Sequence, residues 1–372
     1  MSASTMHATP RETAADQPLL RAARYTSQEC APAVATGERG RDAIARVRAM
    51  LADGTYALER VPCPCGGAQD RCVATVDRYA IPHRTVLCER CGLLRTDPRM
   101  DARATAHFYA NHYRAIYERP DHDPERYFAQ QLLRGQARAR FVLHDVAAPR
   151  SGGRAAEIGC GAGWNLMPYR ERGWECTGWD VDDAYLALGE RHGLRMRRGL
   201  LEDACAAGER HHLVILSHVV EHLLDPVADL RALRGMLLPG GALYVEVPSL
   251  FAAADLARYF QNAHTWNFVP QTLERTMRAA GYRRVWMNGM IESLWRPVGD
   301  AADADAAPAD ARAAFPADPA LVRATERFLR ARERSGALAA RTTALRQRAW
   351  RLRDRLRRGA RLDLTEPPRD AR

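Results

Sequence analysis

Between residues 154 and 249, short apolar runs alternate with amphipathic segments about ten residues long. The runs RAAEIGC, CTGWDV, HHLVILSHV and GALYVEVPS have the length and composition of buried strands. The segments between them, such as DAYLALGERHG and PVADLRALRGML, repeat their apolar residues at helical spacing. Strands that alternate with helices of this length form a parallel sheet covered on both faces. We therefore predict a doubly wound α/β domain in this part of the chain.

The flanking parts of the chain show weaker patterns. GRDAIARVRAMLADG predicts a helix that ends at Gly54, and short β-like runs (RCVATVDRYA and HRTVLC) with pairs of cysteines follow it. HFYANHYRAIY opens a helical stretch, and DAADADAAPADARAAFPADP is of low complexity. The expected division is a disordered N-terminus (1–36), a helix plus a cysteine-bearing segment (37–100), a helical lid or linker (101–147), the α/β domain (148–298), a linker (299–319) and an Arg-rich helical tail (320–372).

Composition and charge narrow the choice of partners. The 372 residues are 47% hydrophobic and 27% charged, which is ordinary for a globular protein. The formal net charge is +10, but 14 arginines against three acids fall between residues 320 and 362. The excess therefore belongs to the tail, which could touch an acidic membrane surface, and we do not expect nucleic acid as a partner. No apolar run has the roughly 18 residues of a membrane span, and the N-terminus does not resemble a signal peptide, so we expect a cytoplasmic protein.

The segment AEIGCGAGWNL, residues 156–166, places glycines at every second position after the first apolar run. A glycine-rich turn between a strand and a helix lets the backbone touch a cofactor without a Cβ in between. The spacing of these glycines differs from that of dinucleotide-binding loops. Glu157 would repel a pyrophosphate but attract an ammonium or sulfonium group. Asp180 ends the next strand, where an acid binds ribose hydroxyls. The pattern therefore favours S-adenosylmethionine over a dinucleotide.

Six motifs, in the order found in one enzyme family, lie between residues 150 and 290. EIGCGAG, GWDVD, GLLED, HLVILSHVVEHLLDP, MLLPGGALYVEVP and HTWNFVPQTLERTMRAAGYRRV resemble motifs of the class I S-adenosylmethionine-dependent methyltransferases. The resemblance implies a Rossmann-like domain with a mostly parallel, seven-stranded sheet, and S-adenosylmethionine as the cofactor. The positions that it assigns to the cofactor are Glu157, Gly159, Cys160, Gly161, Gly163, Asp180, Val181, Glu202, Ser217 and His218.

Two close pairs of cysteines stand out among the nine of the chain: Cys63 and Cys65 in CPCGG, and Cys88 and Cys91 in CERCG. Each pair precedes a glycine, as in the knuckles of a zinc ribbon, and four thiolates satisfy tetrahedral Zn²⁺. We therefore expect a structural zinc ion, because so short a segment cannot build a core alone. The first pair has a single intervening residue, so either its knuckle is contracted or Cys72 replaces one member. Unpaired buried thiols are the alternative without a metal.

The cysteine segment is similar to the zinc-binding region ahead of the catalytic domain in bacterial sugar and small-molecule methyltransferases. CPCGG, RTVLCERCGLLRTDPRM and FYANHY carry this resemblance. The long C-terminal domain of sugar C-methyltransferases is not expected, because a low-complexity linker begins soon after the fold closes. The resemblance implies a small-molecule acceptor, with a nucleotide-linked or lipid-linked sugar as a candidate.

Histidines are the candidates for activating an alcohol acceptor, which needs a base near neutral pH. His264 is the first candidate, because related enzymes carry a histidine followed by a phenylalanine here. His222 and His218 follow the fourth strand, and His222 could instead brace its loop. Tyr109 and Tyr113 share one helix face and could close over the cofactor or pack the lid.

The sequence thus predicts an S-adenosylmethionine-dependent methyltransferase that acts on a small molecule, most simply on a sugar hydroxyl. The alternatives are a sugar C-methyltransferase, and an RNA-binding or RNA-modifying protein that uses the zinc segment and the basic tail. Aromatic residues interleaved with the arginines would favour RNA, but the tail has only Phe328 and Trp350.

Overall fold

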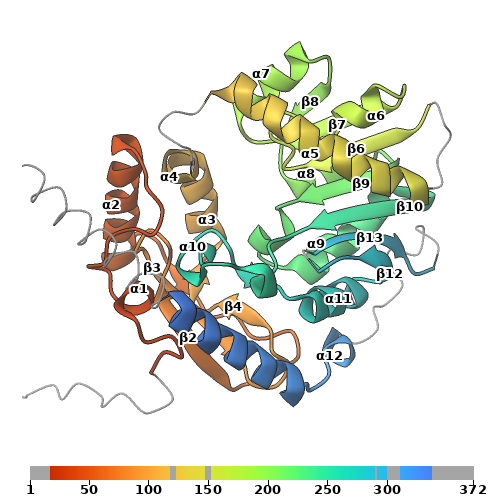
Figure 1. Ribbon diagram of the computed structural model, residues 1–372. Helices are drawn as coiled ribbons and strands as arrows, with labels where there is room; N and C mark the ends of the chain where they lie inside the picture. The colour runs from red at the N-terminus through yellow and green to blue at the C-terminus, as the bar shows by residue number, and fades with distance from the viewer. Residues whose placement is uncertain (1–16, 118–122, 147–151, 290, 300–310, 337–372) are drawn as a thin grey trace, which may run out of the picture.

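The computed structural model describes residues 17–117, 123–146, 152–289, 291–299 and 311–336. The start of the expected N-terminal segment, most of the expected linker and the tail beyond residue 336 lie outside these residues. Figure 1 shows an α/β body and, beside it, a smaller N-terminal body that a long helix, drawn in blue, crosses.

The α/β body is built on a seven-stranded sheet with the strand order β12-β13-β10-β9-β6-β7-β8. The five neighbouring strands from β10 to β8 pair in parallel, and β13 is antiparallel to both of its neighbours, so that β12 points the same way as the five. The strands are β6 (Arg154–Ile158), β7 (Glu175–Asp180), β8 (Arg195–Arg198), β9 (His211–Ser217), β10 (Leu237–Glu246), β12 (Tyr282–Met287) and β13 (Glu292–Pro297). The predicted seven-stranded, mostly parallel sheet is thus confirmed. The chain crosses to the other side of β6 after β8, so the carboxyl ends of β6 and β9 border the crevice where such folds bind ligands.

Helices cover both faces of this sheet. One core contains α5 (Pro124–Asp145), α6 (Met167–Arg170) and α7 (Asp183–Arg191), and the other contains α8 (Leu201–Ala206), α9 (Pro226–Ala232) and α11 (Pro270–Ala279). Along β9, Leu213 and Ile215 point into the first core, while Val214 and Leu216 point into the second. Because both faces are buried, the strands are continuous apolar runs in the sequence.

The N-terminal body combines an antiparallel sheet with a group of helices. Its strands are β2 (Asp70–Val76), β3 (Pro82–Cys88) and β4 (Leu94–Thr96), joined by β11 (Trp266–Asn267) from the loop ahead of α11. Its helices are α2 (Glu38–Ala52), α3 (Ala102–Phe108), the π-helical turn Tyr109–Tyr113 and α4 (Arg114–Tyr117), which share one apolar cluster. Because β11 belongs to the C-terminal part of the chain and pairs with β4, the N-terminal sheet contains a strand from the loop that leads back into the α/β body. The remaining short elements are α1 (Ala23–Thr26), β1 (Leu58–Glu59), β5 (Arg99–Met100), α10 (Leu256–Tyr259), α12 (Ala311–Ala314) and the 3₁₀ turns Val220–His222, Leu233–Met236 and Leu250–Ala252.

Residues 17–36 differ from the expectation of disorder. Leu20 and Tyr25 are buried, and the backbone N–H of Leu20 donates to the carbonyl of Val73 in β2 at 3.1 Å. The carboxylate of Glu333 accepts a hydrogen bond from the backbone N–H of Arg21 at 2.7 Å. These contacts join residues that are far apart in the sequence, which local periodicity cannot reveal.

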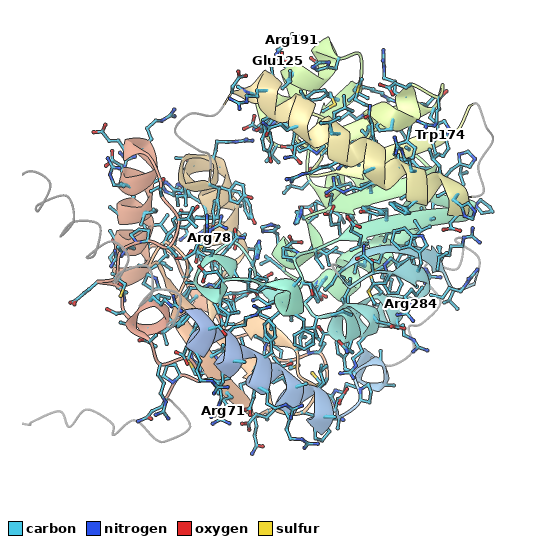
Figure 2. All side chains as sticks on the ribbon, viewed as in Figure 1. Arg71, Arg78, Glu125, Trp174, Arg191 and Arg284 are labelled. Carbon is cyan, nitrogen blue, oxygen red and sulfur yellow. The ribbon has the colours of Figure 1, made fainter. Side chains whose placement is uncertain are left out.

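The helical residues 319–336 lie across the N-terminal body (Figure 1). Leu321 and Leu329 are buried, and Glu326 pairs with Arg71 of β2 at 2.8 Å (Figure 2). The described start of the tail is therefore helical, as predicted, but its apolar side is packed. Phe315, inside the expected linker, is also fully buried. None of the helices in the described ranges is both long and apolar enough to span a membrane.

Candidate cofactor and acceptor site

The glycine loop follows β6 and turns with left-handed backbone angles, φ being 65° at Gly159, 54° at Gly161 and 79° at Gly163. A Cβ on Gly161 would lie 2.4 Å from the ring of Trp164, and one on Gly163 would lie 2.4 Å from Leu194. Both the backbone angles and the packing therefore require glycine. The loop presents bare backbone at the carboxyl edge of the sheet, as a cofactor cradle requires.

Glu157 lies in β6 directly below this loop and is 1% exposed. One carboxylate oxygen accepts a hydrogen bond from the side-chain amide of Asn165 at 2.7 Å, and the other is buried without a partner. Burial raises the pKa of Glu157 to about 8, against the opposing effects of Asn165 and Arg138. An unpartnered buried carboxylate oxygen is costly. It fits the ammonium group of an amino-acid cofactor, which would supply the missing donors.

Asp180 ends β7 next to the loop. Its carboxylate accepts hydrogen bonds from the backbone N–H groups of Gly161 (2.8 Å), Val181 (2.8 Å) and Asp182 (3.0 Å). Burial raises its pKa, and these three N–H groups oppose that rise. A carboxylate has about four acceptor positions, so it can still accept from ribose hydroxyls. The expected ribose acid is thus held rigidly beside the glycine loop.

The other expected cofactor residues differ in exposure and in their distance from the glycine loop. Val181 is 39% exposed next to Asp180, whereas the thiol of Cys160 is fully buried beneath the loop and points to the carbonyl of Gly161. Glu202 is exposed on α8, and its charge helps to raise the pKa of Asp229. None of the described contacts joins Glu202 to the loop or to Asp180. Leu200, which the sequence reasoning missed, is a half-exposed apolar side chain directly after the segment that bonds to Asp180.

A chain of polar contacts links the carboxyl ends of three strands to helix α5. The guanidinium of Arg138 donates to Asn165 at 3.0 Å and to Glu246, at the end of β10, at 2.8 Å. The hydroxyl of Ser217, at the end of β9, donates to Glu246 at 2.9 Å. The other end of α5 is fastened to α7 by the pair Glu125–Arg191 at 3.1 Å (Figure 2). The sequence analysis did not identify Arg138 or Glu246. The one signal in the sequence was that Glu246 is an acid at the end of a buried strand.

The helices of the N-terminal body place a wall of tyrosines beside this edge. The rings of Tyr109, Tyr113 and Tyr117 follow one another with centroids 4.9 Å and 4.7 Å apart. Arg114, on the same segment, pairs at 2.6 Å with Asp182, two residues after Asp180. The expected pairing of Tyr109 and Tyr113 on one face therefore occurs, within a π-helical turn.

The three candidate histidines gather near the end of β9. His218 follows the strand with φ of 58°, a strained angle for histidine, and its Nδ1 lies 3.3 Å from Glu221. The rings of His222 and His264 meet edge to face with centroids 4.8 Å apart. Burial lowers the pKa of His222, and it lowers that of His264 well below the ordinary value.

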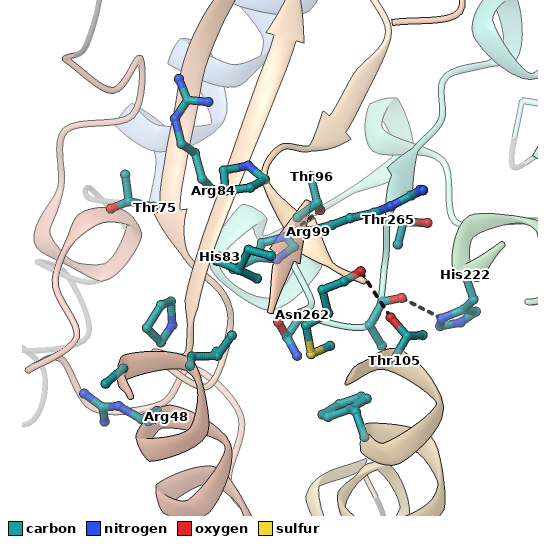
Figure 3. Close-up of a pocket in the computed structure, with 18 of the residues that line it drawn as sticks. Arg48, Thr75, His83, Arg84, Thr96, Arg99, Thr105, His222, Asn262 and Thr265 are labelled. Carbon is teal, nitrogen blue, oxygen red and sulfur yellow. Dashed lines mark hydrogen bonds between the residues drawn. The ribbon is translucent and has the colours of Figure 1, made fainter. Parts of the chain in front are cut away.

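A cavity of about 450 Å³ lies between the N-terminal body and this cluster (Figure 3). Its lining includes Arg48, Arg84, Arg99, Thr105, Phe108, Tyr109, His222, Asn262 and Thr265. His222 thus borders the cavity, whereas His264 is 4% exposed and lies outside its lining. The structure therefore favours His222 over His264 as the histidine that faces an acceptor.

The four predicted cysteines come together under the N-terminal sheet. The sulfur of Cys63 lies 3.3 Å from that of Cys65 and 3.5 Å from that of Cys91, and Cys65 lies 3.5 Å from Cys88. These distances are far too long for disulfides and slightly shorter than the ~3.8 Å between sulfurs around a tetrahedral zinc ion. All four residues are buried, and Gly67 N–H donates to the sulfur of Cys65. The cluster could hold Zn²⁺ with the contracted first pair and without Cys72.

Comparisons with known proteins extend these observations. A family model described as a methyltransferase domain matches residues 132–286. The ubiquinone biosynthesis O-methyltransferase of Cereibacter sphaeroides is 32% identical over 167 residues, which are 40% of this chain and 68% of that protein. The protein of the same name from Dinoroseobacter shibae is 28% identical over 197 residues, 45% of this chain and 79% of that protein.

Solved structures of methyltransferases are also similar. One from Archaeoglobus fulgidus shares 21% identity over 43% of this chain and 75% of its own, with a TM-score of 0.37. The CcbJ methyltransferase from Streptomyces caelestis shares 16% identity over 44% of this chain and 90% of its own, with a TM-score of 0.37. Residues 132–286, which match the family model, contain the glycine loop, Asp180 and all five parallel strands. Together with the relatives' identity over two thirds of their length, this shows that the chain is an enzyme and belongs to the class I S-adenosylmethionine-dependent methyltransferases.

Proposed function

We propose that this enzyme transfers the methyl group of S-adenosylmethionine to a hydroxyl oxygen of a small molecule bound in the cavity beside His222. The cavity carries this proposal, because it is bordered by His222. This histidine lies on the turn after β9, and β9 pairs with β6, the strand that leads into the cofactor loop. Transfer to oxygen is supported by the relatives, which are named as O-methyltransferases. For the acceptor class we propose a sugar, on the resemblance of the N-terminal segment to that of sugar methyltransferases.

The residues of the loop have separate roles in this proposal. The ammonium group of the cofactor donates to the free oxygen of Glu157, and its ribose hydroxyls donate to Asp180. In the reaction the O–H bond of the acceptor and the S–CH₃ bond of the cofactor break, and an O–CH₃ bond forms. S-adenosylhomocysteine and one proton leave. Since the sulfonium is already activated, most of the acceleration can come from positioning.

The far end of the cavity suits an anionic part of the acceptor. Arg48 and Arg84 each use one N–H group on a backbone carbonyl, of Gln28 at 2.7 Å and of Asp97 at 2.8 Å. Both arginines line the cavity, and Figure 3 shows Arg48 and His222 on opposite sides of it. A nucleotide-linked or lipid-linked sugar would place its phosphate at the arginines and its reacting hydroxyl at His222.

The proton of the acceptor leaves through the buried group of Glu221, His222 and His264, with His222 nearest to the cavity. The four cysteines hold a structural zinc ion, because four thiolate ligands leave no position for a substrate. The zinc segment also aligns the acceptor site, since β4 pairs with β11 next to His264.

Acceptor screening tests the proposal. The purified enzyme is given isotopically labelled S-adenosylmethionine and panels of nucleotide sugars, free sugars and catechols, and the products are identified by NMR. A methyl signal on a sugar oxygen supports the full proposal. A methyl signal on carbon or nitrogen would overturn O-methylation, and O-methylation of catechols alone would overturn the sugar.

A further inference from the structure

Three side chains with metal-binding atoms meet beside the cavity, which one of them, His222, borders. They are Glu221 and His222, on the 3₁₀ turn after β9, and His264, on the loop before β11. One carboxylate oxygen of Glu221 and one ring nitrogen from each histidine lie within 4.8 Å of one another. This group is distinct from the four cysteines, which belong to the N-terminal sheet.

The hydrogen bonds of His222 leave the nitrogen that points into the group available as a ligand. Its Nδ1 lies 2.9 Å from the carbonyl oxygen of Ala263 and 2.8 Å from the hydroxyl of Tyr109, which can accept from the same N–H. A carbonyl can only accept, so Nδ1 carries the proton and Nε2 keeps its lone pair. A metal-binding histidine typically uses its second N–H in this way, which fixes the ring and its tautomer. The Nε2 atom lies 3.9 Å from the carboxylate of Glu221.

Glu221 needs a cation. It is 1% exposed, and one of its carboxylate oxygens is buried without a hydrogen-bond partner. A buried carboxylate is stable only if it is paired, hydrogen-bonded or bound to a metal. His218, whose Nδ1 lies 3.3 Å from the other oxygen, is the one described side chain that contacts it this closely. That contact leaves the second oxygen free.

The backbone holds the three residues together before any ligand binds. The carbonyl of Glu221 accepts hydrogen bonds from the backbone N–H of Thr265 at 2.9 Å and from its hydroxyl at 3.1 Å. The hydroxyl of Thr96 in β4 donates to the carbonyl of His264 at 2.9 Å. The turn after β9 and the loop before β11 are thereby fixed to each other, as a preformed metal site requires.

We propose that Glu221, His222 and His264 bind one divalent transition-metal ion, with open positions that face the cavity. Two imidazoles and one carboxylate suit Zn²⁺, Mn²⁺, Fe²⁺ or Co²⁺, and three protein ligands leave room for oxygen atoms of an acceptor. With the ion bound, the two histidines are ligands and no longer accept the proton as they would without the metal. The ion would instead bind the acceptor hydroxyl and lower its pKa, so that the O–H proton leaves to solvent before the O–CH₃ bond forms. The metal site itself stands on the geometry, whereas this catalytic role rests on the proposed function.

Metal titration of the full chain tests the site. The protein is given one equivalent of Zn²⁺, which fills the four-cysteine site first, and is then titrated with Mn²⁺, which thiolates bind poorly, while EPR reports free and bound ion. Wild type should bind one Mn²⁺, whereas His222→Asn, His264→Asn and Glu221→Gln should each lose at least ~30-fold in affinity. His212→Gln, a change to a histidine outside the group, should bind Mn²⁺ like wild type.

A second measurement needs no variant and so does not depend on the variants folding. Pulsed EPR of the wild-type complex should show couplings to the nitrogens of two imidazoles. Weak binding that the three substitutions do not change, or a spectrum without nitrogen couplings, would overturn the metal site.

The catalytic role has a separate readout. If chelation of the Mn²⁺ leaves methyl transfer unchanged, the metal has no part in activation, and the proposed function stands. If the protein binds Mn²⁺ but does not bind S-adenosylmethionine, the proposed function falls while the metal site remains.

Discussion

The guanidinium of Arg138 lies 2.8 Å from the carboxylate of Glu246, so that helix α5 is fastened to the carboxyl end of strand β10. Both side chains are largely buried, at 14% and 13% exposure. Arg138 also donates a hydrogen bond to Asn165, which in turn donates to Glu157. One arginine therefore positions two carboxylates, Glu246 directly and Glu157 through Asn165.

Replacing Arg138 with methionine should therefore affect both stability and cofactor binding. Arg138→Met leaves the carboxylate of Glu246 without its cation, and we expect a loss of about 2–3 kcal/mol in the free energy of unfolding. S-adenosylmethionine affinity should fall with it, because Asn165 and Glu157 lose their support. Urea unfolding and calorimetry measure the two effects. The double variant Arg138→Met, Glu246→Gln should recover part of the stability, and strict additivity of the two changes would contradict the coupling.

The raised pKa of Glu157, about 8, predicts proton release on cofactor binding. The free enzyme holds this carboxyl protonated at neutral pH, whereas binding of an ammonium group requires the carboxylate. Affinity should thus rise about tenfold from pH 6 to pH 7, with about one proton released per cofactor. Calorimetry in two buffers of different ionisation enthalpy measures that proton. Glu157→Gln should bind more weakly and release none, and equal behaviour of the two proteins would refute this role.

The same shift predicts how the stability of the free enzyme depends on pH. The pKa of Glu157 is near 4.5 in the unfolded chain and about 8 in the folded one, so the folded state binds the proton more tightly. Burial of Glu157 therefore lowers the free energy of unfolding least below pH 4.5, where the group is protonated in both states. Stability should fall as the pH rises from 4.5 through 8. Glu157→Gln removes this contribution, so its melting temperature relative to wild type should increase steadily between pH 5 and pH 8.5.

Gly161 offers a sharp test of the cofactor cradle. Gly161→Ala combines a left-handed backbone angle with a Cβ 2.4 Å from Trp164, and we expect at least a tenfold loss of S-adenosylmethionine affinity. Gly173→Ala is the matched control, because Gly173 has φ of 78° but no atom within 4 Å of the added Cβ. It should cost about 1 kcal/mol of stability and leave the affinity unchanged. Similar affinities for both variants would show that the loop does not contact the cofactor.

The cysteine cluster predicts which thiol holds the metal. Cys88→Ser should lower the zinc content by one ion per chain and reduce the melting temperature by more than about 10 °C, because the metal supports the N-terminal sheet. Cys72→Ser should keep its zinc, since the sulfur of Cys72 lies near the carbonyl of Ala74 and outside the cluster. Loss of zinc from Cys72→Ser instead would mean that Cys72 is a ligand.

Features that local sequence patterns encode could be predicted from the chain. The strands of the central sheet are continuous apolar runs, the glycine loop has a required spacing, and the four cysteines come in two close pairs. Asp180 ends the strand that follows the glycine loop. Each of these depends on residues near one another in the sequence.

Features that depend on distant residues could not be predicted. Arg138 and Glu246 are 108 residues apart, and only the packing of α5 on the sheet brings them together. Residues 17–36 lack periodicity but are ordered by β2 and by the helical residues 319–336. The choice between His222 and His264 depends on which side chain borders the cavity, which the sequence pattern does not contain. The segments between the strands are expected to be helices of about ten residues, but the segment between β6 and β7 has a single helical turn, Met167–Arg170, because the glycine loop continues into it.

Binding of S-adenosylmethionine to the wild-type protein and to Asp180→Ala, measured by calorimetry, tests the central claim most directly. Wild type should bind in the micromolar range, and Asp180→Ala should bind about 100-fold more weakly, because two hydrogen bonds to a charged group are lost. Asp183→Ala, in the next turn of the chain, should bind like wild type. Folded wild-type protein that does not bind S-adenosylmethionine, or Asp180→Ala that binds as tightly as wild type, would contradict the account of the cofactor site.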